Sequence, residues 1–369
     1  MKIYTATFYK NNYGSALQAV ALQQKIKELG GDSVIIGIRA KQEKLRFKDK
    51  VVLFLRPEKH YGVIRKLRRS LQRKIFTEKT RKINEFVDRN ATVRKFENCA
   101  AEIEENGGTL LVGSDQVWNT LNHPIDGFYL FDYISNPNVK RVSYAASIGI
   151  SEINAEHIEY YKKVLKNFDT VSFREKAAYD ALSGHLDNSI VRQDVDPTLL
   201  FTGDHWAGYA KGEMHIKPYL FIYMLRPSSE VIQVARELAR QKKLDIIYMG
   251  LYVNHYRGIK TIDDAGVEEF LSYIRYADVV VTNSFHGTAF SLLFEKKFVS
   301  VKIESTSSRV ENLLYLTGMQ GHLINGKEDC SVAYEEYDIE KVKSRLKSLR
   351  SNSIDYLRSL VDDSFGVEK

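Results

Sequence analysis

The residues with the clearest chemical potential lie in one polar run, Asn283-Ser284-Phe285-His286-Gly287-Thr288. The run follows the apolar strand-like segment Val279-Val280-Val281 and leads into a predicted helix. Free backbone N–H groups and the positive end of a helix dipole meet at such a turn, which makes it a natural anion site. His286 adds a group that can exchange a proton near neutral pH. The alternative is a capped helix with a structural histidine, and the residues alone leave both interpretations open.

The residues on either side of His286 also suit an anion site. Ser284 and Thr288 supply hydroxyl groups, and Gly287 would let a ligand approach the backbone closely. We therefore predict that Ser284, Phe285, Gly287 and Thr288 bind an anionic ligand next to His286.

Two arginines, like His286, lie where a ligand could bind beside the end of a predicted strand or the start of a predicted helix. Arg174 follows the predicted strand 170–173, where a guanidinium suits a carboxylate or a phosphate, although a structural pair with Glu175 or Glu152 is the alternative. Arg309 follows a hydroxyl-rich loop, 305–308, which could hold an anion or simply cap the next helix.

The segment Asn11-Asn12-Tyr13-Gly14-Ser15 joins the first predicted strand to the first helix. It does not match the G-x-G-x-x-G pattern, and no acidic residue follows at the expected distance, so a nicotinamide or flavin cofactor is not predicted. The chain has no Walker-type phosphate loop, and its His, Cys and carboxylate positions show no metal-ligand spacing. We predict neither a cofactor nor a metal site.

The elements that position these residues alternate between strand and helix. The chain begins with a strand over 2–9, a helix from Ser15 that ends at Gly30-Gly31, and a buried strand over 33–38. Further strands are predicted over 109–112, 141–146 and 170–173, each followed by polar or glycine residues. Such a βαβ pattern indicates a parallel sheet, and ligands bind at the carboxyl ends of its strands.

The pattern restarts near Tyr219. Strands are predicted over 219–225, 244–250, 278–282 and 298–302, and helices over 229–241, 267–276, 288–294 and 309–316. We therefore predict an α/β protein with two doubly wound domains, 1–200 and 201–335, which join around 200–217. The segment 336–369 contains a long amphipathic helical stretch, Tyr337–Asp363.

The composition is that of a globular protein with 369 residues, 44% of them hydrophobic and 27% charged. No run approaches the roughly 18 apolar residues of a membrane span, and the N-terminus does not resemble a signal peptide. With only Cys99 and Cys330, a disulfide framework is not expected. These features predict a cytoplasmic protein.

The net charge of +7 is concentrated in one segment, 39–95, which contains 20 Lys or Arg residues and 6 Asp or Glu residues. Within it, the stretch 63–76 has an apolar stripe surrounded by basic residues, as in helices that lie on an anionic membrane surface. A solvated helix packed on its own domain is the alternative. No nucleic-acid partner is predicted, because the basic residues are confined to one segment without an aromatic platform.

Seven segments, in the same order, resemble the polysaccharide pyruvyl transferase family. They are Asn12–Ala19, Gly113–Asn119, Ser143–Gly149, Ser172–Glu175, Asp196–Leu200, Glu268–Leu271 and Ala277–Ser291. Together they extend over roughly residues 1–320, apart from the basic segment. One departure is that the family often has Gly-Pro-x-Glu-Phe-Leu where this chain has Ala265–Leu271 without proline.

This resemblance implies a GT-B-like fold, with two Rossmann-like domains facing a cleft and the C-terminal helix returning to the first domain. It implies phosphoenolpyruvate as the donor, no other cofactor, and two hydroxyls of a glycan or lipid-linked sugar as the acceptor in capsule or exopolysaccharide biosynthesis. The catalytic residues would be His286, as the proton donor or a donor-site ligand, and Arg174, as a ligand of the donor's anionic groups. Arg309 would bind the donor as well.

The donor site would also include Ser284, Phe285, Gly287 and Thr288, in the C-terminal domain. The N-terminal domain would bind the acceptor through polar residues that follow two of its strands, namely Asn12, Tyr13, Gly14, Ser114, Asp115 and Gln116. The alternatives are a GT-B glycosyltransferase with a nucleotide-sugar donor, since one architecture serves several chemistries, and a binding protein without turnover. If the acceptor is lipid-linked, the stretch 63–76 would place the enzyme on the inner face of the cytoplasmic membrane.

Overall fold

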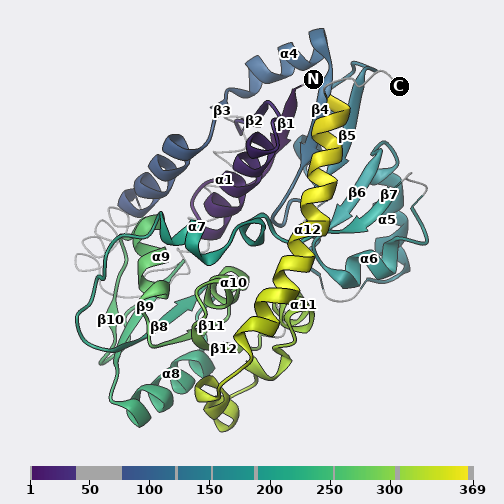
Figure 1. The fold of residues 1–369 in the computed structure, drawn as a ribbon. Helices are drawn as coiled ribbons and strands as arrows, with labels where there is room; N and C mark the ends of the chain where they lie inside the picture. The colour runs from purple at the N-terminus through teal and green to yellow at the C-terminus, as the bar shows by residue number, and fades with distance from the viewer. Residues whose placement is uncertain are drawn as a thin grey trace, which may run out of the picture.

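The carboxyl ends of two parallel sheets face each other in the computed structural model of this chain (Figure 1). The structure describes residues 2–38, 77–120, 124–150, 153–186, 190–251, 254–303 and 308–364. The predicted membrane-binding stretch 63–76 and the alternative Arg174 partner Glu152 lie outside these ranges, as does most of the loop before Arg309.

The first sheet contains seven parallel strands within the described ranges. Their spatial order is β3 (Val93–Arg94), β2 (Ser33–Ile36), β1 (Ile3–Ala6), β4 (Gly108–Val112), β5 (Val139–Ser143), β6 (Thr170–Phe173) and β7 (Ile190–Gln193). The strand order reverses between β1 and β4, and such a reversal opens a crevice above the sheet where ligands bind.

The second sheet contains six parallel strands within the described ranges. Their spatial order is β10 (Lys260–Thr261), β9 (Asp245–Gly250), β8 (Tyr219–Met224), β11 (Val279–Thr282), β12 (Lys297–Val301) and β13 (Leu323–Ile324). Its reversal lies between β8 and β11, so the turn after β11 stands at the equivalent crevice.

Alternation along the strands divides the apolar side chains between two faces of each sheet. In β4, Leu110 and Val112 face a core formed with α4 (Phe96–Asn106), α5 (Ala155–Leu165) and α6 (Lys176–Leu182). Leu111 points to the opposite face, which is covered by α1 (Tyr13–Glu28). The second sheet is likewise covered by α8 (Ser229–Lys242) on one face, and by α9 (Val267–Arg275) and α10 (Phe285–Leu293) on the other.

One hydrophobic core joins the inner faces of both sheets. It includes Leu17 and Val20 of α1 together with Phe270 of α9 and Phe290 of α10. Every residue of α1 from Tyr13 to Gln23 is buried. A helix covered on all sides by protein holds its first turn at a defined place between the sheets, and this placement matters for the site described below.

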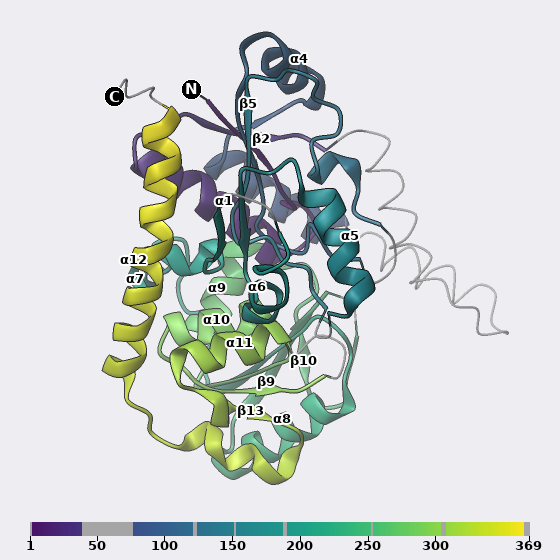
Figure 2. The ribbon, with the colours of Figure 1, turned by 90° about the vertical axis from the view of Figure 1, so that its right-hand side faces the viewer.

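The connection between the sheets and the last helix both contribute to this arrangement. The connection contains η2 (Pro197–Leu200) and α7 (Gly203–Ala207). Helix α12 (Ile339–Ser364) then runs along the length of the molecule beside both sheets (Figures 1 and 2). Near its start, Lys343 pairs with Glu295 at 2.8 Å, and near its end the Tyr356 hydroxyl donates to the Ser143 carbonyl at 2.9 Å.

Several predicted boundaries differ from the structure. The predicted strand 141–146 is observed as Val139–Ser143, because Ala145 adopts a positive φ of 44° that interrupts the ladder. The short edge strands β3, β10 and β13 were not predicted, since two residues carry too little periodicity. The predicted helix 288–294 begins three residues earlier, at Phe285, so His286 lies in the first helical turn.

None of the helices in the described ranges combines the length and apolar composition that crossing a lipid bilayer would require.

Candidate active site

His286 is placed by the strand and cap that precede it. Strand β11 ends at Thr282, and the side chain of Ser284 accepts a hydrogen bond from the Gly287 N–H at 3.4 Å, which starts α10. The His286 ring is 6% exposed, and its Nε2 atom is buried without a hydrogen-bond partner. Buried polar atoms are nearly always hydrogen-bonded, so this nitrogen is available for a ligand.

A buried carboxylate connects His286 to the first sheet. Asp196 follows β7 and accepts a hydrogen bond on Oδ2 from Arg174 Nη1 at 2.7 Å, while His286 Nε2 lies 3.7 Å from the same oxygen. That distance exceeds a hydrogen bond, but it allows an ion pair with Asp196 when the imidazole is protonated. Thr198 donates its backbone N–H and its hydroxyl to Oδ1 at 3.0 and 2.7 Å. Burial opposes ionisation of Asp196, but His286, Arg174 and Thr198 together hold its pKa well below the ordinary value.

Arg174 uses only part of its guanidinium for Asp196. Its Nε and Nη2 atoms are buried and have no hydrogen-bond partner among the described residues, and its Cζ lies 4.7 Å from the centroid of the Phe285 ring. The ring and the ion pair together orient the group. Burial alone would lower the pKa of Arg174, but the nearby carboxylates, Asp196 foremost, raise it. The side chain is therefore a fixed cation with two donor nitrogens still unused.

Arg309 brings a second cation to this place from α11 (Ser308–Thr317). It is 9% exposed, and among the described residues it has no hydrogen bond or ion pair. Burial, followed by the like charge of Arg174, lowers the pKa of Arg309 to about 10, although Glu175, Asp115 and Asp196 act in the opposite direction. A buried guanidinium without a partner beside a second guanidinium favours the binding of an anion.

The first turn of α1 approaches the same place from the N-terminal sheet. The Asn12 side chain caps α1 by accepting from the Gly14 N–H at 3.0 Å. A Cβ atom on Gly14 would overlap the imidazole of His286, so the helix start and the ring are in direct contact. Tyr13 has a packing role, because its hydroxyl donates to the Ala265 carbonyl at 2.9 Å and its ring stacks on Phe270.

The other predicted acceptor residues follow β4, across the strand-order reversal from α1. Asp115 accepts from the Ser15 hydroxyl at 2.6 Å and from the Gln116 backbone N–H at 2.9 Å. Ser114 is fully buried, and its hydroxyl donates to the Ala145 carbonyl at 2.7 Å. The Gln116 side chain is partly exposed and lies against Gly149. The structure thus brings Asp115 close to the arginines, whereas Ser114 supports the loop.

The predicted donor residues beside His286 are largely occupied by internal contacts. The Thr288 hydroxyl donates to the Ser284 carbonyl at 3.0 Å and also bonds the Ser300 hydroxyl at 2.7 Å. The space that a Cβ atom on Gly287 would take is filled by Thr282. Gly287 is needed for helix packing against β11, and Phe285 contacts Arg174 rather than lying free.

Two carboxylates of the site were not predicted from the sequence. Asp196 and Glu175 are fully buried beside Arg174. Both belong to segments that carry the family resemblance, Asp196–Leu200 and Ser172–Glu175, and this was the available signal. The hydrogen-bonded ion pair of Arg174 is with Asp196 and not with the alternative partner Glu175, whereas the other alternative, Glu152, lies outside the described residues.

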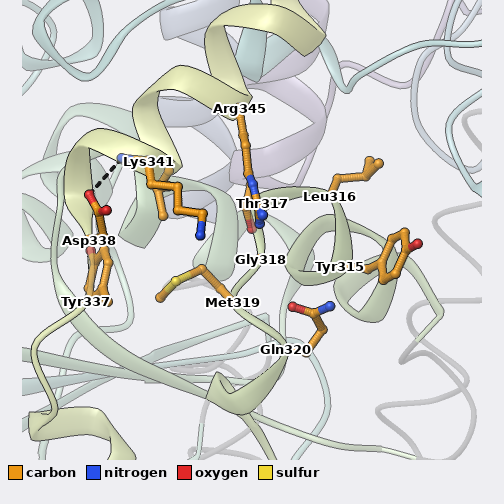
Figure 3. A pocket seen from close by; sticks show the side chains of 11 residues that line it. Tyr315, Leu316, Thr317, Gly318, Met319, Gln320, Tyr337, Asp338, Lys341 and Arg345 are labelled. Carbon is orange, nitrogen blue, oxygen red and sulfur yellow. Dashed lines mark hydrogen bonds between the residues drawn. The ribbon is translucent and has the colours of Figure 1, made fainter.

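A hollow of about 580 Å³ lies away from this cluster, between the end of α11 and the start of α12 (Figure 3). Lys341 and Arg345 point into it, and Gln320 and Tyr315 lie at its edge. None of its lining residues belongs to the cluster around His286. We place the active site at the buried cluster around His286, because Arg174, Glu175 and His286 there each have buried side-chain atoms without hydrogen-bond partners. Within the described ranges, no group of three or more His, Cys, Asp or Glu side chains could hold a metal ion.

The sequence profile of the family described as polysaccharide pyruvyl transferase matches residues 12–305. The chain belongs to the polysaccharide pyruvyl transferase family. The predicted family is thereby confirmed, and the matched range contains Arg174, Asp196 and His286 but ends just before Arg309. No curated protein matches the sequence of this chain significantly.

Solved structures with the same fold are nucleotide-sugar enzymes. A UDP-N-acetylglucosamine 2-epimerase matches with a TM-score of 0.55 and 12% identity, over 100% of this chain and 97% of its own. The S. aureus MnaA–UDP co-structure matches with a TM-score of 0.50 and 13% identity, over 97% and 94%. The UDP-N-acetylglucosamine 2-epimerase from Rickettsia bellii matches with a TM-score of 0.50 and 11% identity, over 97% and 98%. At these identities the likeness concerns the fold alone, and it confirms the predicted GT-B-like arrangement.

Proposed function

We propose that this chain transfers the enolpyruvyl group of phosphoenolpyruvate to two hydroxyls of a glycan or a lipid-linked sugar. The product would be a pyruvyl ketal, made for capsule or exopolysaccharide biosynthesis. The observation that carries the proposal is the buried Arg309, which has no ion-pair partner among the described residues and faces the charge of Arg174.

The donor has the charge and shape that this cluster calls for. Phosphoenolpyruvate carries a carboxylate and a phosphate on adjacent atoms, and guanidinium groups bind both of these through paired hydrogen bonds. Arg174 offers Nε and Nη2 for one anionic group, and Arg309 is available for the other. A neutral sugar would offer no anionic group to Arg309 or to the two free nitrogens of Arg174.

His286 is suited to supply the proton that the reaction needs. Ketal formation from an enol phosphate requires a proton at the methylene carbon, and the unpartnered Nε2 is the ring atom available to deliver it. Asp196, 3.7 Å away, stabilises the charged imidazolium. General acid catalysis of this kind contributes roughly 10²–10⁴-fold to a rate.

The test of the donor is a thermal-shift titration of the protein with phosphoenolpyruvate and, in parallel, a panel of nucleotide sugars. We expect stabilisation by phosphoenolpyruvate and an affinity loss on the order of 10–100-fold in Arg309→Ala, since a charge-assisted bond is removed. Arg358→Ala is the matched control, because Arg358 is exposed and, among the described residues, pairs with Asp355 alone. Stabilisation by a nucleotide sugar alone would favour the glycosyltransferase alternative.

The test of turnover is phosphate release from phosphoenolpyruvate in the presence of candidate acceptors, followed by mass spectrometry of the product. The ketal adds one pyruvyl group and consumes two hydroxyls. Binding of the donor without any phosphate release would instead indicate a protein without catalytic turnover.

We also propose that the enzyme acts in the cytoplasm, at the inner face of the membrane, through the basic stretch 63–76. The concentration of positive charge in 39–95 supports this, because anionic lipid surfaces attract basic segments. Sedimentation with vesicles rich in phosphatidylglycerol, compared with neutral phosphatidylcholine vesicles, tests it. No binding at low salt would remove the membrane role and leave the transferase proposal intact.

A further inference from the structure

Three carboxylates act on the two arginines of the site, namely Asp115, Glu175 and Asp196. They differ in whether their oxygens are already hydrogen-bonded. In Asp115, Oδ2 accepts from the Ser15 hydroxyl and Oδ1 accepts from the Gln116 N–H. Both oxygens of this carboxylate are therefore engaged by neighbouring groups.

Asp196 is also satisfied, since Oδ2 accepts from Arg174 and Oδ1 accepts twice from Thr198. Glu175 is different. Its Oε1 accepts from the Ser147 hydroxyl, whereas its Oε2 is buried and has no hydrogen-bond donor. Of these three carboxylates, only Glu175 retains an oxygen that is ready to accept a bond.

The free oxygen belongs to a set of complementary unpartnered atoms. In the part of the chain that the structure describes, Arg174 Nε, Arg174 Nη2 and His286 Nε2 are buried nitrogens without hydrogen-bond partners, and Glu175 Oε2 is a buried oxygen without one. Native proteins leave few such atoms, and those they leave need an explanation. The nitrogens suit an anion, but a carboxylate oxygen repels an anion and calls for a hydrogen-bond donor, and a hydroxyl group is such a donor.

We propose that Glu175 is a catalytic residue that accepts a hydrogen bond from an acceptor hydroxyl and then takes its proton. This inference rests on the proposed transferase function and extends it, because it assigns the acceptor-side chemistry to one side chain. It also changes the picture of acceptor binding, in which Ser114 and Tyr13 were expected to take part but make internal contacts instead.

The proton balance of the reaction accommodates this role. His286 gives a proton to the methylene carbon of the donor, which leaves the central carbon electron-poor. The first hydroxyl oxygen bonds to that carbon while its O–H bond breaks and Glu175 takes the proton. Glu175 returns this proton to the bridging phosphate oxygen as the carbon–oxygen bond breaks and phosphate leaves. The second hydroxyl bonds to the same carbon and gives its proton to His286, so both side chains are restored and nothing is oxidised or reduced.

The experiment compares Glu175→Gln with the wild-type protein. Glutamine keeps the size of the side chain and an oxygen that can accept from Ser147, but it cannot take a proton. We expect kcat for phosphate release to fall roughly 10²–10⁴-fold, as for loss of a general base, with phosphoenolpyruvate affinity unchanged within about threefold. The acceptors are methyl hexopyranosides with free 4- and 6-hydroxyl groups. The matched control is Glu156→Gln, since Glu156 is exposed on α5.

A second variant protects the test against a folding defect. Glu175→Asp keeps the carboxylate on a shorter side chain, and we expect a loss of at least about tenfold in kcat with wild-type donor affinity, because misplacement of a catalytic group lowers the rate. Calorimetric titration with phosphoenolpyruvate measures that affinity in both variants.

The outcomes separate the two proposals. Wild-type turnover together with a Glu175→Gln rate near wild type would overturn the role of Glu175 and leave the transferase function standing. Loss of phosphoenolpyruvate binding in both folded variants would also overturn it, since Glu175 would then serve the donor site. A wild-type protein that neither binds phosphoenolpyruvate nor releases phosphate would overturn the function itself, and the role of Glu175 with it.

Discussion

Helices α1 and α10 each begin soon after a central strand of their sheet, and each begins with a polar side chain that accepts a bond from an N–H of the first turn. Both turns join a strand to a helix through a side-chain cap, but the polar side chains that follow the two caps make different contacts. At the start of α1, the Tyr13 hydroxyl is bonded to the Ala265 carbonyl. At the start of α10, His286 Nε2 has no hydrogen-bond partner among the described residues. The same strand-to-helix turn thus serves packing at α1, and at α10 it presents a nitrogen that can bind a ligand.

The two turns also touch, because Gly14 lies against the His286 ring. Each of the following changes breaks one side of the comparison or the contact between the two sides.

Replacement of His286 by alanine should have the largest effect. We expect kcat for phosphate release to fall roughly 10²–10⁴-fold, because the proton donor is lost while the cap of α10 by Ser284 remains. Steady-state kinetics with saturating phosphoenolpyruvate measures this. A rate equal to that of the wild-type protein would remove the proton-donor role.

Asp196→Asn should break the link between Arg174 and His286. The variant leaves Arg174 buried without its counter-ion, which typically costs about 3–5 kcal/mol in the free energy of unfolding. Since the pKa of Asp196 is lowered by folding, its contribution is complete above the pKa of an unfolded aspartate, roughly 3.9, and is lost as the pH falls below it. Urea unfolding of both proteins should therefore show a large difference at pH 7 that narrows below about pH 4. A difference independent of pH would contradict this assignment.

Gly14→Ala tests the contact between the turns. The added methyl group would overlap the imidazole, so His286 or α1 must shift, and misplacement of a catalytic group by about 1 Å can cost on the order of 10²-fold in rate. Gly184→Ala is the matched control, since nothing lies within 4 Å of the added atom there. Wild-type activity in Gly14→Ala would show that the two turns act independently.

Asn12→Ala should have the smallest effect. Removal of this cap typically costs about 1 kcal/mol in the free energy of unfolding, and we expect kcat to change by less than roughly threefold. Thermal melting and the phosphate-release assay measure the two quantities. A catalytic loss as large as that of His286→Ala would show that the α1 turn takes part in the chemistry.

The individual elements of the site could be predicted from the sequence because each depends on local order. The run 279–288 changes from apolar to polar residues where β11 ends, and from this change alone we predicted an anion site near His286. Arg174 was recognised in the same way, since it follows β6 directly. The exact start of α10 was missed by three residues, because Ser284 rather than Gly287 provides the cap.

The partners of these residues could not be predicted, because they depend on how two sheets stack. Asp196 is 22 residues from Arg174 and far more distant from His286 along the chain, yet one of its oxygens lies close to both. The unsatisfied oxygen of Glu175 has no signature in the sequence at all. Likewise, the contact of Gly14 with His286 exists only because α1 is buried between the two halves.

Helix α12 has a mechanical consequence for these contacts. Its 26 residues form one continuous rod, about 39 Å long at 1.5 Å per residue, which is fastened to the second half through Glu295 and to the first through Ser143. Hinge opening of the two halves would have to bend this rod or detach one end. The helix therefore acts as a strut that sets the spacing between Arg174 and His286 when the chain folds, before any substrate arrives.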